Sequence, residues 1–151
     1  VYTKAQIQVA IETSTLEKMS SSREGCERNT LNGIPMEAMF VDVIKDREEG
    51  SNTNYKDFAQ SAVKFHWETQ NSVRQESPTG QSYIKGSREM LLFVRKQKNA
   101  AENKYRTLGY VYLGKVTLDK YAGNKPMQIV WNLKTPMPGS VYEYAATLAN
   151  V

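Results

Sequence analysis

Hydrophobic and polar residues alternate through much of the second half of the chain, and this alternation predicts β-strands. The stretch "EMLLFVR" (89–95) is a short apolar run rich in strand formers, and "YRTLGYVYLGKVTLDKY" (105–121) alternates. The alternation places five side chains of the second stretch on one face: Leu108, Tyr110, Tyr112, Val116 and Leu118. Gly109 and Gly114 within it predict bulges or bends, which curve a sheet toward a barrel.

A further strand is predicted in "KPMQIVWNLK" (125–134), which lies between Pro126 and Pro136. Its alternation gathers four apolar side chains on one face: Met127, Ile129, Trp131 and Leu133. The stretch after Pro136, "PGSVYEYAATLA" (138–149), closes the chain as a short helix in this interpretation.

The first half mixes one helix with strands. Thr3 followed by Gln6 is a capping-box pattern, and it precedes Ile7, Ala10 and Ile11 on one helical face. "MEAMFVDVIK" (36–45) alternates as a strand, with Met39, Val41 and Val43 on one side. A shorter strand is expected near 24–28, and "DFAQSAVKFHW" (57–67) leads into another. The pattern predicts an α+β fold, with a curved antiparallel sheet or open barrel and a few peripheral short helices.

Length and composition indicate one domain over residues 1–151, large enough to bury a core. The absence of an initial Met favours a domain excised from a longer protein. No apolar run reaches the length of a membrane span and no signal peptide is evident, so we expect no membrane partner. A single cysteine, Cys26, excludes an internal disulfide framework and fits a reducing cytoplasm.

Positive charge is concentrated in one segment. Residues 1–84 hold 9 Lys/Arg against 12 Asp/Glu, a net charge of −3, whereas residues 85–125 hold 10 Lys/Arg against 3 Asp/Glu, a net charge of +7. The whole chain has a net charge of +4. Concentrated positive charge attracts polyanions such as nucleic acid. The alternative is a solvated loop, because "RKQKNAAENKYR" (95–106) is typical of an exposed hairpin connection.

Motifs for catalysis are lacking in the sequence. It contains no phosphate-binding loop, no nucleophile elbow and no zinc-protease helix motif. His66 and Cys26 are too few for a zinc site, and a lone histidine beside a tryptophan is more typical of a packed strand residue than of a catalyst. We therefore expect a binding module that is not an enzyme, with no metal, no cofactor and no catalytic residue.

Aromatic and amide side chains are gathered in "FHWETQNSVRQESPTGQSY" (65–83). A pocket for an extruded base needs flat rings to stack on it and polar groups for its hydrogen-bonding edge. Seven residues here or just upstream fit that description, and they are the base-pocket candidates: Tyr55, Asp57, Trp67, Gln70, Asn71, Ser72 and Tyr83. The other interpretation is structural: the two rings fill a core, while Asn71 and the "SPTG" turn hold a loop.

The stretches "YKDFAQSAVKFHWETQNSVRQESPTGQSYI" (55–84), "MLLFVR" (90–95), "LGYVYLGKV" (108–116) and "KPMQIVWNLKTPMP" (125–138) together resemble one bacterial domain family. It is the C-terminal domain of fusion proteins that carry a phospholipase-D-type nuclease and a superfamily-2 helicase. The best-known fusions are SauUSI-type, modification-dependent (type IV) restriction enzymes. The match covers nearly the whole chain and departs most at residues 98–107.

The resemblance implies an SRA/PUA-like reader that flips a modified cytosine out of double-stranded DNA. On this view the domain is the target-recognition module of an ATP-dependent enzyme for phage defence, which reads 5-methyl or 5-hydroxymethylcytosine. Its partners would be DNA and the helicase and nuclease domains of the same chain. We expect nine residues to contact the DNA backbone: His66, Arg74, Lys85, Arg88, Arg95, Lys96, Lys98, Lys104 and Arg106. Two alternatives remain open: a generic nucleic-acid clamp without a modified-base pocket, or a scaffold that docks the motor to the nuclease.

Overall fold

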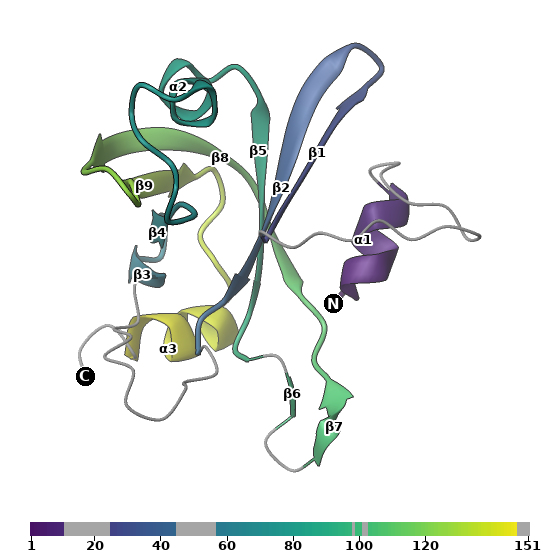
Figure 1. Ribbon diagram of the computed structural model, residues 1–151. Helices are drawn as coiled ribbons and strands as arrows, with labels where there is room; N and C mark the ends of the chain where they lie inside the picture. Colours follow the sequence, from purple (N-terminus) through teal and green to yellow (C-terminus); the bar gives the residue numbers. More distant parts are fainter. Residues whose placement is uncertain (11–24, 45–56, 98, 101–102, 148–151) are drawn as a thin grey trace.

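The computed structural model describes residues 1–10, 25–44, 57–97, 99–100 and 103–147 (Figure 1). Three short helices lie in these ranges: α1 (Lys4–Ala10), α2 (Pro78–Lys85) and α3 (Gly139–Thr147). The strands are β1 (Cys26–Leu31), β2 (Ile34–Asp42), β3 (Phe58–Ser61), β4 (Lys64–Glu68), β5 (Glu89–Arg95), β6 (Asn99–Ala100), β7 (Asn103–Thr107), β8 (Val111–Ala122) and β9 (Gln128–Leu133). None of the described helices is long and apolar enough to cross a bilayer.

Seven strands form one open sheet in the order β1-β2-β5-β8-β9-β4-β3, and β6 and β7 form a separate hairpin. The fold is mostly β with three short helices, which confirms the predicted α+β class with peripheral helices. The sheet is mixed, because β2 and β5 are parallel while the other neighbours are antiparallel. Between β2 and β5 the chain forms the β3–β4 hairpin at the far edge of the sheet and then α2. Because of this crossover, β5 runs parallel to β2. Alternation along a single strand does not reveal the direction of its neighbour.

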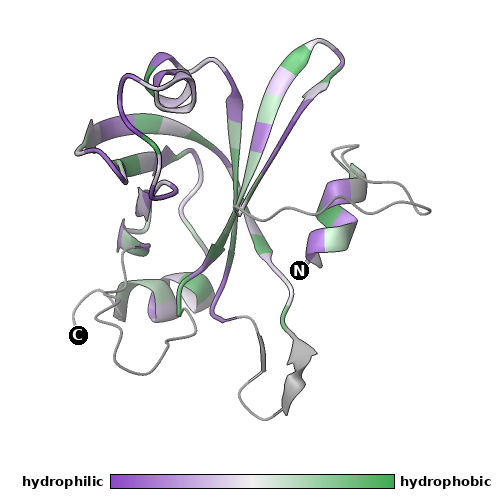
Figure 2. Cartoon of the chain, viewed as in Figure 1, coloured by the Kyte–Doolittle hydropathy of each residue, from purple (hydrophilic) through white to green (hydrophobic). Residues whose placement is uncertain are grey.

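The sheet has apolar side chains on both faces. The main core lies inside the curve of the sheet, between α2 and α3, and includes Met39, Phe65 and Trp131. The second core lies on the opposite face, under α1, and consists of six buried residues: Ile7, Ala38, Phe40, Leu91, Phe93 and Tyr110. β2 and β5 contribute to both cores, and Figure 2 shows hydrophobic positions where these strands cross the centre of the domain. The predicted inward face of 127–133 is confirmed, since Met127, Ile129, Trp131 and Leu133 are all buried.

The start of α1 was predicted correctly, whereas the start of α2 was not recognised as one. The capping box of α1 is confirmed, because Thr3 N–H donates to Gln6 Oε1 (2.9 Å) and Gln6 N–H donates to Thr3 Oγ1 (3.1 Å). The "SPTG" stretch, read as a turn, instead begins α2: Ser77 is the N-cap residue, accepting from Gly80 N–H at 3.2 Å, and Pro78 follows it. A side chain at Gly80 would collide with the Arg74 carbonyl, so glycine lets the helix pack against its own loop.

The predicted face of β8 is wrong in part, because a bulge interrupts the alternation. Leu92 of β5 pairs with Gly114, whereas the next residue, Phe93, pairs with Tyr112, so Leu113 is the extra residue. Gly114 has a φ of +95°, which a side chain would disfavour. Before the bulge, Tyr110 and Tyr112 lie on the side of the second core, and after it Val116 and Leu118 face the main core. The bulge predicted at this glycine is therefore confirmed, and it places Tyr110 and Tyr112 on one face and Val116 and Leu118 on the other.

Candidate functional site

An opening in the sheet forms where β8 changes its neighbour. β5 pairs with one edge of β8 over Val111–Val116, and β9 pairs with the other edge over Val116–Ala122. Beyond Val116 the first edge of β8 has no strand neighbour within the described residues, because β5 only begins at Glu89. The C-terminal end of α2 and the connection to β5 lie beside this gap (Figure 1).

A cavity of about 250 Å³ occupies this gap. Its apolar lining comes from β5, β8, β9 and α2, and consists of Tyr83, Met90, Val116, Leu118 and Trp131. The polar lining consists of Arg88, Glu89, Lys115, Thr117 and Lys134, together with Gly86. The volume lies below the roughly 300–1,000 Å³ of pockets for drug-sized ligands, so it suits one small ring system. We call it the β8 cavity.

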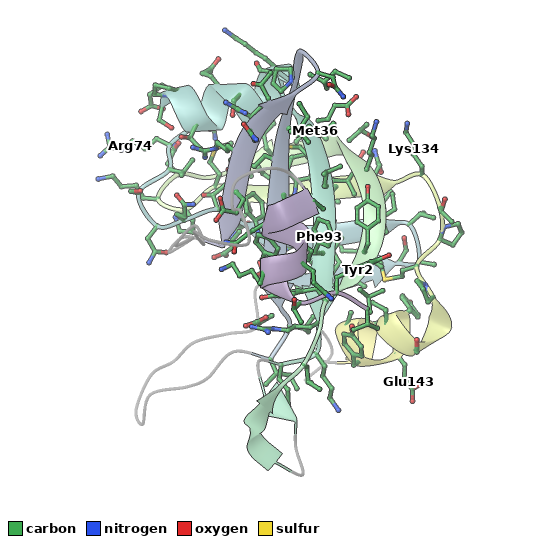
Figure 3. The ribbon with its side chains drawn as sticks, turned by 90° about the vertical axis from the view of Figure 1, so that its right-hand side faces the viewer. Tyr2, Met36, Arg74, Phe93, Lys134 and Glu143 are labelled. Carbon is green, nitrogen blue, oxygen red and sulfur yellow. The ribbon has the colours of Figure 1, made fainter. Side chains whose placement is uncertain are left out.

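Three cations surround the β8 cavity. Arg88 is half-buried and donates Nη1–H to the Met36 carbonyl (3.2 Å), which fixes its position. Lys115 is exposed and pairs with Glu89 (2.9 Å), and this carboxylate raises the pKa of the Lys115 ammonium. Lys134 is exposed just beyond the end of β9 and projects from the surface in Figure 3. With one carboxylate among three cations, the rim attracts anions.

The aromatic residues predicted to stack on a base lie in the main core. Tyr83 is 2% exposed and Trp67 is 6% exposed, and their rings meet edge to face at 5.6 Å. Tyr83 also packs edge to face with Trp131 at 6.2 Å. Only Tyr83 and Trp131 of these three line the β8 cavity. The structural interpretation of Trp67 and Tyr83 therefore describes their packing, although Tyr83 also contributes to the cavity lining and Trp67 does not.

The hydroxyl of Tyr83 donates to an ion pair whose carboxylate is buried. It donates to Glu37 Oε2 (2.7 Å), and Arg28 Nε–H donates to Glu37 Oε1 (2.6 Å) across the β1–β2 pair. Glu37 is completely buried, and burial, with Cys26 and Glu37 nearby, raises the pKa of Tyr83 well above its ordinary value. The sequence interpretation missed Glu37. Its signal was available, because Glu37 is in phase with Met39, Val41 and Val43 on the inward side of β2.

The predicted amide cluster lies on the loop between β4 and α2. Asn71 and Ser72 are exposed and Gln70 is half-buried, and none of the three lines the β8 cavity. Their loop is tied to the β8–β9 turn, since Gln75 N–H donates to Asn124 Oδ1 (2.7 Å) and Lys125 N–H donates to the Val73 carbonyl. The structure therefore does not gather these amides with the predicted rings.

Asp57 and Tyr55 are the two base-pocket candidates that lie upstream of this loop. Asp57 is buried and accepts from Glu68 N–H (2.9 Å), so its carboxylate supports the β3–β4 hairpin. Tyr55 lies outside the described residues.

His66 lies on the face of β4 opposite the main core. Its ring stacks on Phe58 at 4.6 Å, with 14° between the ring planes. Around it is a shallow hollow of about 270 Å³ lined by Gln60, His66, Lys120, Tyr121, Ala122, Gln128 and Val130. Within the described residues, no group of three or more His, Cys, Asp and Glu side chains is arranged to hold a metal ion. His66 is thus a packed strand residue that does not line the β8 cavity.

The cations of the basic segment whose side chains are described lie in different surroundings. Arg95 does not fit the predicted contact with the DNA backbone, because it is only 8% exposed. It makes a bidentate ion pair with Asp42 and stacks over the Tyr110 ring at 4.3 Å. Lys85 and Lys96 are exposed, whereas Lys98 lies outside the described residues. The side chains of Lys104 and Arg106 on β7 are also outside them.

Arg74, the remaining predicted backbone contact, is exposed on the loop before α2. In Figure 3 it projects on the opposite side of the domain from Lys134. Of the predicted cations whose side chains the structure describes, only Arg88 lines the β8 cavity, where Lys115 and Lys134 join it.

Fold and site together define a small mostly β domain whose mixed sheet opens into a cavity with an aromatic lining and a cationic rim. Residues 1–145 match the family described as "Domain of unknown function (DUF3427)", and the chain belongs to that family. No curated protein and no solved structure matches the chain significantly.

Proposed function

We propose that this domain is a DNA-recognition module that holds a flipped, modified cytosine in the β8 cavity. The observation that carries the proposal is the combination, in one opening, of an aromatic and apolar lining with Arg88, Lys115 and Lys134 at the rim. A flipped base brings a flat, weakly polar ring into a pocket and leaves its phosphates outside, where cations bind them. The lining and the rim of the β8 cavity match these two parts of a nucleotide.

The proposed pocket contains different residues from the pocket that the sequence predicted. Tyr83 and Arg88 remain, while Trp67 supports the rings from behind and Gln70, Asn71 and Ser72 stand on a separate loop. Thr117 and the Glu89–Lys115 pair supply polar groups that can meet the hydrogen-bonding edge of a base.

The resemblance to SauUSI-type enzymes supports a role in an ATP-dependent, modification-dependent restriction enzyme. In this proposal the helicase and the phospholipase-D-type nuclease supply the chemistry, and this domain selects the DNA. Its partners are therefore double-stranded DNA with 5-methyl or 5-hydroxymethylcytosine, and the motor and nuclease domains of the same parent chain. The domain itself has no catalytic role.

The cavity is tested by filling it. Leu118 is half-buried and lines the cavity from the main-core side of β8, so Leu118→Trp should fill part of the opening, provided that the variant still folds. Binding is measured to matched duplexes with and without 5-methylcytosine, at several salt concentrations. A buried methyl contributes about 0.8 kcal/mol, so we expect the unchanged protein to prefer the methylated duplex about fourfold. Leu118→Trp should abolish that preference and leave nonspecific binding intact.

The rim is tested by a double variant, Lys115→Ala/Lys134→Ala. It should weaken binding to every duplex and flatten the salt dependence by up to about 0.9 for each lost phosphate contact. Lys120→Ala/Lys125→Ala is the matched control, because both lysines are exposed and neither lines the cavity. Equal effects of the two double variants would contradict the proposed rim. Tight binding without a preference for methylated DNA would instead identify a generic clamp, and no salt-dependent binding would identify a docking scaffold.

A further inference from the structure

The outer face of the sheet has a hollow that belongs to neither core. Helices α2 and α3 contribute to the main core, and α1 packs on the second core with β2 and β5. The hollow of about 270 Å³ around His66 lies farther along the outer face, over β3, β4, β9 and the C-terminal half of β8. We call it the His66 hollow. One of its lining residues, Val130, is 4% exposed but is part of neither core.

Strand pairing places four side chains in one row across this face. Phe58 pairs with His66, His66 with Val130, and Val130 with Lys120. On the β3 side, the Phe58 ring stacks on the His66 ring at 4.6 Å. On the β9 side, His66, Val130 and Lys120 all line the hollow. Val130 is therefore its floor, and the His66 ring and Lys120 stand on opposite sides of it.

The spacing of this row suits one flat ring. Neighbouring strands lie about 4.8 Å apart, so His66 and Lys120, which are two strands apart, are separated by about 10 Å at the backbone. A planar group needs about 3.5–4.0 Å on each side for van der Waals contact. One aromatic ring therefore fits above Val130, between the imidazole of His66 and the side chain of Lys120.

The other lining residues favour a nucleic-acid base over an aromatic side chain of a protein. Gln60 and Gln128 are exposed and carry amides, which match the donors and acceptors on the edge of any base. Tyr121 is 42% exposed and adds a second ring. Lys120 supplies a positive charge for a phosphate. Rings for stacking beside a cation for the backbone are typical of sites for single-stranded nucleic acid.

We propose that the His66 hollow binds one base of an unpaired, unmodified nucleic-acid strand, stacked on His66 with its phosphate beside Lys120. The inference goes beyond the proposed function, because it needs neither a duplex nor a modified base and uses no residue that lines the β8 cavity. Strand β8 connects the two sites, since Val116 lies in the cavity lining and Lys120 in the hollow. Four residues of a strand span about 13 Å, so an unpaired strand beside a bound duplex is within reach of the hollow.

The experiment adds unmodified oligothymidylate, a strand that does not pair with itself, to the isotope-labelled protein. NMR signals of the Val130 methyl groups and the His66 ring should shift, whereas those of Val116 and Leu118 in the β8 cavity should not. His66→Ala removes the stacking ring. Loss of stacking with one base predicts a decrease in affinity of about five- to 150-fold.

Val130→Phe gives a second test if His66→Ala disturbs the packing of Phe58. Val130 lies outside both cores, so the new ring should occupy the hollow and prevent binding of the strand. Tyr121→Ala and Tyr112→Ala form a matched pair, because both tyrosines are on β8 and 42% exposed but only Tyr121 lines the hollow. Tyr121→Ala should weaken binding of the strand, and Tyr112→Ala should not.

Unchanged affinity in Val130→Phe, equal losses in the two tyrosine variants, or signal shifts confined to the β8 cavity would overturn the inference. N-acetyltyrosine amide and thymidine monophosphate test the other sources of a flat ring. If either shifts the Val130 signals at a lower concentration than the strand does, the hollow accepts a protein side chain or a free nucleotide, and the assignment to a strand is wrong. The proposed function fails separately, if the unchanged protein does not distinguish methylated from unmethylated duplex.

Discussion

Two clusters on opposite faces of β2 combine the same three chemical groups in different ways. The inner cluster, on the main-core side, consists of Arg28, Glu37 and Tyr83. The outer cluster, on the second-core side, consists of Asp42, Arg95 and Tyr110. In the inner cluster the carboxylate is fully buried and the arginine side chain is 37% exposed. In the outer cluster the arginine side chain is 10% exposed and the carboxylate is 28% exposed.

The tyrosines also have different roles. Tyr83 donates its hydroxyl to Glu37, whereas the ring of Tyr110 lies under the guanidinium of Arg95 at 4.3 Å. Arg95 has a further partner in the Leu108 carbonyl (3.1 Å), so it connects β5 to the chain just before β8. The inner cluster instead holds Tyr83 in the wall of the β8 cavity.

The difference shows that an ion pair has a buried member and a more exposed member, and that the cost of breaking it depends on which one remains. A buried charge without its partner loses both its solvation and its counter-charge. If Arg28 were removed, Glu37 would keep the Tyr83 hydroxyl as a neutral partner but would lose its counter-charge. Arg95 would keep the Leu108 carbonyl and the Tyr110 ring if Asp42 were removed. We therefore expect the inner cluster to be the more sensitive one.

The largest effect is expected from Arg28→Ala, which leaves the carboxylate of Glu37 buried without a counter-charge. The free energy of unfolding should fall by about 3–5 kcal/mol, measured by chemical denaturation at neutral pH. The control is Arg28→Ala/Glu37→Leu, which removes both charges and should recover part of the loss. If the double variant is less stable than Arg28→Ala, the isolated charge is not the cause.

Asp42→Ala should have a smaller effect on the outer cluster, about 2–3 kcal/mol, because Arg95 retains two partners and some contact with water. The same denaturation measurement checks it beside Arg28→Ala. A loss in Asp42→Ala that equals or exceeds the loss in Arg28→Ala would reverse the comparison between the two clusters.

Tyr83→Phe removes one hydroxyl from the inner cluster and should cost about 1–1.5 kcal/mol at neutral pH. It should also change the alkaline behaviour, because burial raises the pKa of Tyr83 in the folded state. An unfolded tyrosine ionises near its ordinary pKa of about 10. The stability contributed by the neutral folded form is therefore present below that pH and is lost as the pH rises above it.

The expected slope is about 1.4 kcal/mol per pH unit for each such tyrosine above its unfolded pKa. Denaturation from pH 8 to 11 should show a shallower alkaline decline in Tyr83→Phe than in the unchanged protein. Tyr110→Phe is the matched variant, because burial also raises the pKa of Tyr110. Identical slopes in Tyr83→Phe and the unchanged protein would contradict the buried, neutral hydroxyl.

The smallest effect is expected from Lys64→Ala, which breaks an ion pair of similar geometry at the surface. Lys64 Nζ lies 2.8 Å from Asp119 Oδ2, but their side chains are 43% and 27% exposed. Solvent screening limits such pairs to about 0–1 kcal/mol, and 0.5 M salt should reduce this contribution further. If Lys64→Ala lowers the free energy of unfolding as much as Asp42→Ala does, distance rather than burial determines how much these ion pairs stabilise the protein.

Local signals in the sequence were reliable where the interaction itself is local. The capping box joins residues three positions apart, and its two hydrogen bonds are present. The alternation in 127–133 gives the inward face of β9, because successive side chains of a strand point to opposite faces. Gly114 was correctly expected at a bulge, although the change of face that the bulge imposes on Val116 and Leu118 was not deduced.

The candidate site could not be deduced in the same way. Trp67, Asn71 and Tyr83 are close in sequence, but the two rings point into the main core while Asn71 is exposed on a loop. Arg95 and Lys96 are adjacent in a basic run, yet Arg95 is buried by its pairing with Asp42 and Lys96 is exposed. Proximity in the sequence did not report which side of the sheet each residue occupies.

By itself, the sequence determined β2, β5, β8 and β9, the N-terminal cap of α1, the α+β class and the apolar face of β9. These features depend on backbone preferences and on side-chain spacing within one segment. Only the tertiary structure decided that β2 and β5 run parallel, that β8 changes neighbours at Val116, and that a cavity opens there. Alternation within a strand specifies its two faces but not the strand that pairs with each edge. That choice depends on contacts between distant segments, and the β8 cavity with Trp131 in its lining is a consequence of it.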